Sequence, residues 1–109
     1  MDRHRKRELQ HRSLGRLRNE IAAERAAALT RITRTLERHC AHARDLWVEI
    51  RDNDDEPSSE RCAAYEAARR QAGTYLWYLR VQREVNGLFD GDTLEERYAI
   101  PAPLEQLPR

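Results

Sequence analysis

Two histidines and a cysteine, His39, Cys40 and His42, lie within four consecutive positions of the sequence. Imidazole nitrogen and thiolate sulfur are ligands that zinc prefers. On a helix, however, neighbouring side chains diverge by about 100° per residue, so these three groups cannot converge on one ion. The other cysteine, Cys62, is expected to face Trp47, about 10 Å along the helix from Cys40. We therefore expect no metal and no cofactor, and keep four residues only as candidates for a thiol or metal sensor: His39, Cys40, His42 and Cys62.

Other residue types that carry catalysis are scattered along the chain. Serine occurs only at positions 13, 58 and 59, and none of the three lies in the strand–turn–helix setting of a nucleophilic serine. There is no glycine-rich phosphate loop. The acidic run from Asp52 to Glu56 lacks the central glycine and the terminal glutamate of a calcium-binding loop. The sequence therefore predicts that the protein is not an enzyme.

The first 18 residues are strongly basic. Asp2 and Glu8 are outnumbered by seven basic residues, Arg3, Arg5, Lys6, Arg7, Arg12, Arg16 and Arg18. Such a cluster attracts the phosphates of nucleic acids through counterion release. It contains no interleaved aromatic residues for base stacking and no helix-turn-helix pattern. Nucleic-acid or anion contact is therefore an alternative interpretation, with these candidates: Arg3, Arg5, Lys6, Arg7, Arg12 and Arg16.

A long first helix must position these groups. Residues 5–52 contain no proline and a single glycine, Gly15. At about 100° per residue, the apolar residues of this stretch fall in one sector: Leu14, Leu17, Ile21, Ala28, Leu29, Ile32, Leu36, Ala43, Leu46, Trp47 and Ile50. The pattern predicts one amphipathic helix over residues 5–52, with residues 1–12 as a basic arm whose first turns can fray.

Turn residues and prolines delimit the rest of the chain. Pro57 suits the opening turn of a helix, and Gly87 can adopt the positive φ that often ends one. Two prolines near the C-terminus exclude a helix there and favour extended backbone. The expected elements are an acidic turn at 53–57, a second helix at 58–86, a short helix at 93–98 and an extended tail at 99–109.

The second helix is apolar on two sides. One stripe is suited to face the first helix: Tyr65, Ala68, Ala72, Tyr75, Leu76 and Leu79. Another stripe lies roughly opposite, with Trp77 at its edge, and is called here the second apolar face: Ala63, Ala67, Trp77, Tyr78, Val81, Val85 and Leu88. Patches of this composition seldom stay exposed without a reason. The cover is either a second copy of the chain or the tail, through Leu94, Tyr98, Ile100 and Leu104.

Composition narrows the class of protein. With 36% charged and 39% hydrophobic residues and a net charge of +1, the chain suits long helices that each bury one stripe. Its longest strongly apolar run, residues 75–79, is far shorter than the roughly 20 residues of a membrane span. The N-terminus lacks the apolar core of a signal peptide, and two cysteines form no disulfide framework. We expect a cytoplasmic protein without a membrane segment.

Together these features predict an all-α fold in a single domain, residues 1–109. An antiparallel hairpin of two long helices precedes a short C-terminal helix and an extended proline-containing tail. A hairpin of this size buries little apolar surface alone, so a homodimer forming a four-helix-type bundle is expected. The leading hypothesis is a non-catalytic protein–protein interaction or self-assembly protein acting through Ala67, Trp77, Tyr78, Val81, Val85 and Leu88. The alternatives are an Arg-rich nucleic-acid-associated protein and a thiol or metal sensor.

Overall fold

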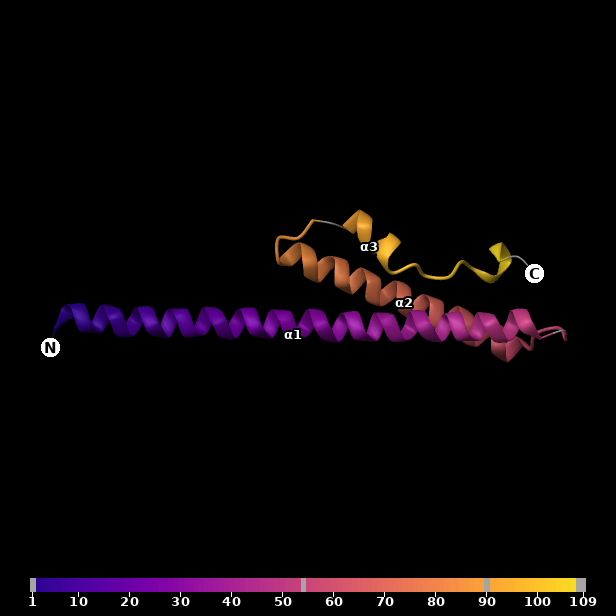
Figure 1. Cartoon of the computed structure of the whole chain (residues 1–109), viewed down its shortest axis with the longest axis horizontal. Helices are drawn as coiled ribbons and strands as arrows, with labels where there is room; N and C mark the ends of the chain where they lie inside the picture. The colour runs from indigo at the N-terminus through magenta and orange to yellow at the C-terminus, as the bar shows by residue number, and fades with distance from the viewer. Residues whose placement is uncertain (1, 54, 90, 108–109) are drawn as a thin grey trace. The chain divides into compact units, whose positions relative to one another are not determined.

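A computed structural model describes residues 2–53, 55–89 and 91–107, apart from the side chains of residues 91 and 92. This part of the chain is almost entirely helical and contains no strand, which confirms the all-α prediction of two long helices and a short one. Figure 1 shows the elements in order: α1 (Arg3–Asp52), α2 (Ser59–Val85), α3 (Gly91–Arg97) and the single 3₁₀ turn η1 (Leu104–Gln106). Met1 of the expected arm, Asp54 of the expected turn and residues 108–109 of the expected tail lie outside the described residues.

The chain divides into two compact units, residues 1–30 and 31–109, and α1 contributes to both. In the first unit, every described side chain up to residue 26 is exposed. Residues 3–12, where frayed first turns were expected, are helical, and Gly15 lies inside α1 without interrupting it. A Cβ on Gly15 would meet nothing within 4 Å, so no neighbouring atom requires a glycine at this position.

The second unit has a small core where α1 and α2 meet. Ala43 of α1 is fully buried together with Tyr65 of α2, and Ala68 lies beside them. The rings of Trp47 and Tyr65 have their centroids 6.3 Å apart. The two small alanine side chains and the two large rings therefore pack together in this core.

The predicted inner stripe of α2 is confirmed by burial. Tyr75 is half-buried, and its ring lies against His39 of α1 with centroids 5.4 Å apart. The other five residues of the stripe are buried: Tyr65, Ala68, Ala72, Leu76 and Leu79. The 3.6-residue period of the helix therefore identifies the side of α2 that carries the core.

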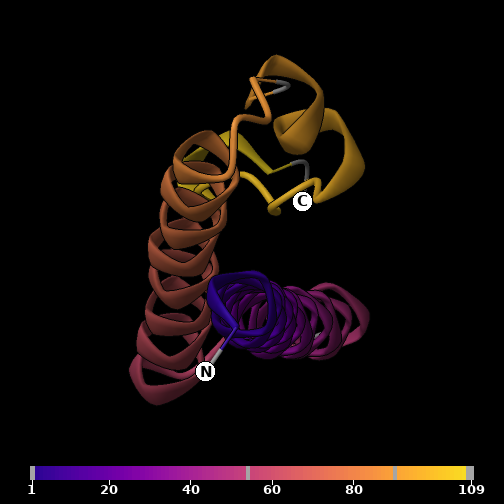
Figure 2. The same cartoon turned by 90° about the vertical axis from the view of Figure 1, so that its left-hand side faces the viewer.

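The C-terminal segment, residues 91–107, packs along α2. Leu94 of α3 is only 1% exposed, and Leu104 and Leu107 pack against the core at Ala43 and Tyr65. In Figure 2 this segment and the part of α1 from Arg31 onward lie on the same side of α2. The other side of α2 is left without a neighbouring element among the described residues of the second unit.

Both ends of α2 carry local signals that its sequence contains. Ser58 is the N-cap, and its hydroxyl accepts a hydrogen bond of 3.2 Å from the backbone N–H of Arg61. At the other end Gly87 has a φ of 81°, and the N–H of Leu88 donates to the carbonyl of Arg83 at 2.8 Å. This is the αL glycine turn expected after the helix.

Candidate interaction surface

The second apolar face is exposed in the described structure. Ala63 and Ala67, at the start of α2, are exposed. The large side chains of the face are exposed by 58% at Trp77, 43% at Tyr78, 36% at Val81, 65% at Val85 and 43% at Leu88. Several large apolar side chains gathered on one side of one helix form an exposed apolar patch.

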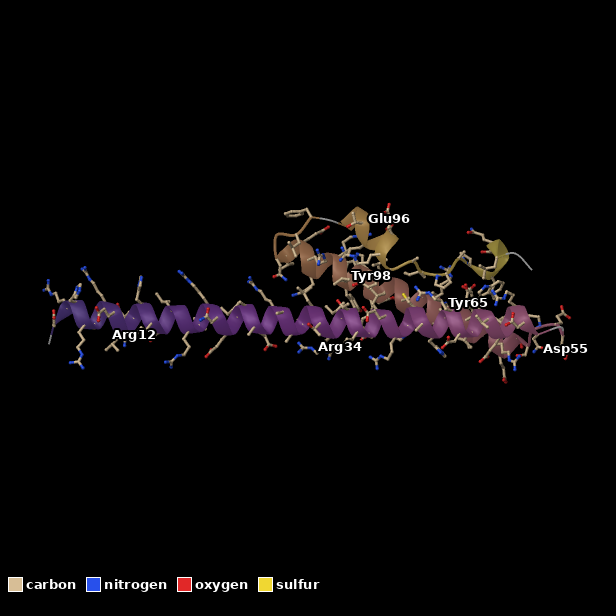
Figure 3. All side chains as sticks on the ribbon, in the orientation of Figure 1. Arg12, Arg34, Asp55, Tyr65, Glu96 and Tyr98 are labelled. Carbon is tan, nitrogen blue, oxygen red and sulfur yellow. The ribbon has the colours of Figure 1, made fainter. Side chains whose placement is uncertain are left out.

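The C-terminal segment lies elsewhere on α2, although the tail was one of the two covers expected for this face. The Tyr65 hydroxyl donates a hydrogen bond of 2.6 Å to the carbonyl of Ala102. Next to it, the backbone N–H of Leu104 donates to Glu66 Oε1 at 3.1 Å. These contacts hold the segment beside the inner stripe, where Figure 3 shows Tyr65 between the helices and the segment. Trp77 therefore keeps more than half of its surface exposed.

A row of rings connects α1 to the second apolar face. From the His39 contact, Tyr75 continues to Tyr78 with ring centroids 5.3 Å apart and an interplanar angle of 79°. Tyr78 in turn meets Trp77 at 5.8 Å and 60°. Edge-to-face contacts of this kind favour defined ring orientations. The two aromatic residues of the face, Trp77 and Tyr78, are thus positioned by contacts with neighbouring rings.

A surface hollow of about 850 Å³ borders the face. On one side it is lined by Arg70, Gly73, Thr74 and Trp77 of α2, and on the other by residues 100–103 of the C-terminal segment. A Cβ on Gly73 would meet nothing within 4 Å. The missing side chain therefore leaves open space at this side of the hollow.

The sequence did not identify the residues that hold the C-terminal segment. Besides the contacts of Tyr65 and Glu66, Arg44 Nη2 donates to the carbonyl of Ala99 at 3.3 Å, and Arg80 forms an ion pair of 2.8 Å with Glu95. The prolines indicated an extended backbone. Residue spacing gives no information on which distant side chains reach its carbonyls.

Burial of Tyr65 changes its acidity. Desolvation raises the pKa of its phenol above the ordinary value, the charge of Arg69 opposes this increase, and the charge of Glu66 adds to it. The neutral hydroxyl is the form that donates to Ala102. Tyr65 is therefore held as a neutral donor in the folded chain.

The four metal-ligand candidates are spread over different environments. Cys40 is buried, and burial raises the pKa of its thiol, with a smaller opposing effect from Arg44. His39 lies against a tyrosine ring, His42 is exposed, and Cys62 is half-buried. Among the described residues, no group of three or more histidine, cysteine, aspartate or glutamate side chains could hold a metal ion. The structure does not bring these candidates together.

The basic candidates are accessible along the first unit. Arg12 extends away from α1 in Figure 3. All six are exposed on helical backbone: Arg3, Arg5, Lys6, Arg7, Arg12 and Arg16. Positive side chains presented this way on one helix produce a local field that attracts anions.

Comparison with known proteins adds no assignment. The chain matches no protein-family model, no curated protein sequence and no solved structure. Within the described residues, none of the helices combines the length and the apolar character that a bilayer span requires.

Proposed function

We propose that this chain is a non-catalytic helical protein that self-assembles through the second apolar face of α2. The observation that carries the proposal is the exposure of Trp77, Tyr78 and Val85 on a single side of this helix. Tyr78 and Val85 lie seven residues apart on one face of the helix and Trp77 lies at its edge, so one partner surface can contact all three. The C-terminal segment is held on another side of the helix by hydrogen bonds of its own.

The thinness of the core supports association. Within the described chain, the largest side chains below 2% exposure are Leu36, Tyr65 and Leu94. A chain of this size buries a modest fraction of its surface, and small helical folds commonly gain stability by oligomerising. When only the folded chain can bind a second copy, this binding shifts the folding equilibrium toward the folded form by mass action.

The finer arrangement follows from the same surface. An antiparallel hairpin of α1 and α2 in each copy would place both α2 helices at the centre of a four-helix-type bundle, with α1 outside. Such a homodimer needs neither a cofactor nor a membrane. We also propose that the protein is cytoplasmic, as expected from the sequence.

The test is the mass of the protein in solution, measured by light scattering at high salt. Wild type is expected to be larger than a monomer, because an apolar contact survives salt screening. Val81→Glu and Tyr78→Glu place a carboxylate on the face and should give a monomer. Val48→Glu is the matched control, since Val48 on α1 is 42% exposed and lies outside the face.

Circular dichroism separates loss of association from loss of fold. The proposal is supported where Val81→Glu lowers the mass and Val48→Glu leaves it unchanged at equal helicity. A wild-type protein that is monomeric at all accessible concentrations, and indifferent to the glutamate at position 81, would show that this face has no such role.

A second candidate function is supported by the exposure of all six basic candidates on the regular helix of the first unit. That surface suits the phosphate backbone of a nucleic acid. Affinity for random duplex DNA or RNA should then fall steeply with salt. Charge reversal at Arg12 and Arg16 should reduce the slope of log K against log salt by about two, because each phosphate neutralised on duplex DNA adds roughly 0.9 to that slope. Absence of binding at low salt would remove this candidate.

A further inference from the structure

Side-chain size changes along the second apolar face. It begins with two alanines, Ala63 and Ala67, and ends with the larger Val81, Val85 and Leu88. All of these side chains are exposed, so the gradient is a property of the accessible surface. Thr74 lies between the two halves and is also exposed.

The gradient selects how two such faces fit together. If two α2 helices run antiparallel and cross at Thr74, positions equally distant from Thr74 meet. Ala67 then lies opposite Val81, and Ala63 opposite Val85. Small against large residues fill space at the density of a protein interior. A parallel pair would leave a gap between alanines and crowd the large side chains at the other end.

Charge favours the same direction. Arg70 is exposed at the edge of the face and lies four residues before Thr74. An antiparallel pair places it at the level of Tyr78 of the second copy and next to that copy's Trp77. A guanidinium over an aromatic ring is attractive. A parallel pair would instead place Arg70 at the level of the other Arg70, with like charges together.

The hollow provides a position for the most exposed aromatic residue of the face. It opens beside Arg70, Gly73 and Thr74, with residues 100–103 as its far wall. In the antiparallel pair, Trp77 of the second copy arrives three residues before Thr74, on the same flank as this opening. An aromatic side chain entering a pocket near the centre of an interface is the usual anchor of binding energy. The two-fold axis repeats this contact, so both hollows are filled.

The exposed area of the second apolar face agrees with a dimer in which two such faces are in contact. At their exposed fractions, the five large side chains present on the order of 500 Å² per copy, taking 150–250 Å² for each whole aromatic residue. Two copies bury about twice that value, which reaches the roughly 1,000 Å² expected of a specific interface. Figure 2 shows the side of α2 opposite α1 and the C-terminal segment free for this contact within the second unit.

We infer that the partner is a second copy of this chain, docked with its α2 antiparallel across Thr74 and its Trp77 in the hollow beside Gly73. The inference rests on the proposed function and adds the direction of pairing and the anchor residue. The interface is isologous, because the same residues contribute from both copies.

Disulfide cross-linking distinguishes an antiparallel from a parallel pair of α2 helices. In a Cys62→Ser background, where the remaining Cys40 is buried, single cysteines are introduced at positions 67, 74 and 81 and oxidised with copper–phenanthroline. Thr74→Cys should form a covalent dimer alone, because the two Cα atoms lie near the axis, within the about 7 Å a disulfide allows. Ala67→Cys and Val81→Cys should cross-link only when mixed. In a dimer of Ala67→Cys alone, or of Val81→Cys alone, the two introduced thiols lie about 21 Å apart along the helices.

The outcomes separate the inference from the proposed function. Self-cross-linking of Ala67→Cys in a dimer that Val81→Glu dissociates would overturn the antiparallel arrangement and leave the proposed function standing. A wild-type monomer that forms no cross-links would end both. Val48→Cys is the control for random collision, and cross-linking there as efficient as at position 74 would also overturn the arrangement.

A second variant tests the anchor. Gly73→Leu fills the hollow without touching a neighbour at its Cβ, and should weaken dimerisation about tenfold because Trp77 loses its site. Gly15→Leu is the matched control, since its Cβ also meets nothing within 4 Å and the residue lies in the first unit. Equal dimer affinities for the two variants would show that Trp77 does not enter the hollow.

Discussion

At the scale of single residues, Tyr65 joins three parts of the second unit. Its ring is fully buried beside Trp47, and its hydroxyl holds the carbonyl of Ala102. Tyr65→Phe keeps the ring and removes the donor, leaving a carbonyl without its partner. We expect the free energy of unfolding to fall by about 1 kcal/mol, measured as a lower urea midpoint at constant slope. Tyr75→Phe is the control. It also removes a tyrosine hydroxyl, but the contacts of Tyr75 with His39 and Tyr78 are made by its ring, which phenylalanine keeps.

The same hydroxyl predicts a dependence on pH. Since burial raises the pKa of folded Tyr65, the unfolded chain loses this proton first, near pH 10. Its contribution to stability is complete below pH 10 and is lost as pH rises through the folded pKa. Unfolding midpoints of wild type should therefore fall more steeply above pH 10 than those of Tyr65→Phe. Parallel curves would contradict a buried, hydrogen-bonded phenol.

The identity of the buried residues on α2 could be predicted from the sequence, because a helix repeats every 3.6 residues. Tyr65, Ala72 and Leu79 recur at seven-residue spacing and are all buried. The role of Glu66 could not be predicted in this way. Its carboxylate accepts from the backbone of Leu104, 38 positions later, and side-chain periodicity carries no information on contacts with a distant backbone.

At the scale of elements, α1 continues through Gly15 although nothing around that residue requires glycine. Glycine costs about 1 kcal/mol relative to alanine in a helix interior. Gly15→Ala should therefore increase the helicity of residues 3–26, because this part of α1 has exposed side chains and little packing to support it. The measurement is the circular dichroism signal at 222 nm over a temperature ramp.

A second glycine gives the contrast for that prediction. Gly87 has a positive φ of 81°, which alanine adopts only with strain. Gly87→Ala should destabilise the end of α2, whereas Gly15→Ala stabilises α1. Opposite signs for the two substitutions are expected, and a loss of helicity in Gly15→Ala would show that glycine is needed at position 15.

Element type could be predicted more completely than element placement. The long proline-free run predicted α1, and Pro57 and Gly87 predicted where α2 begins and ends; in the structure Ser58 caps its start and Gly87 follows its end. The sequence left open whether the tail or a second copy covers the second apolar face. The short connection after Gly87 permits more than one direction, and the observed placement is held by the contacts of α3 with α2 and by the hydrogen bond from Arg44 to the carbonyl of Ala99.

At the scale of the whole molecule, the second unit depends on the C-terminal segment to close its core. Leu104 and Leu107 of the segment pack against Ala43 and Tyr65, as do Leu46, Trp47 and Ile50 of α1. The C-terminal segment thus covers a part of the core that a third helix covers in a three-helix bundle. An exposed second apolar face remains because this closure uses only the side of α2 near Tyr65.

Removal of residues 99–109 tests this dependence. The shortened chain loses two partly buried leucines and the acceptor of Tyr65, so the free energy of unfolding should fall by about 2–4 kcal/mol. The double substitution Leu104→Ala and Leu107→Ala should reproduce most of that loss with the backbone intact. Urea unfolding at matched concentration measures both. An unchanged midpoint in the shortened chain would mean that the helices close their core without the segment, and that the exposed Trp77 side is not a consequence of where the segment docks.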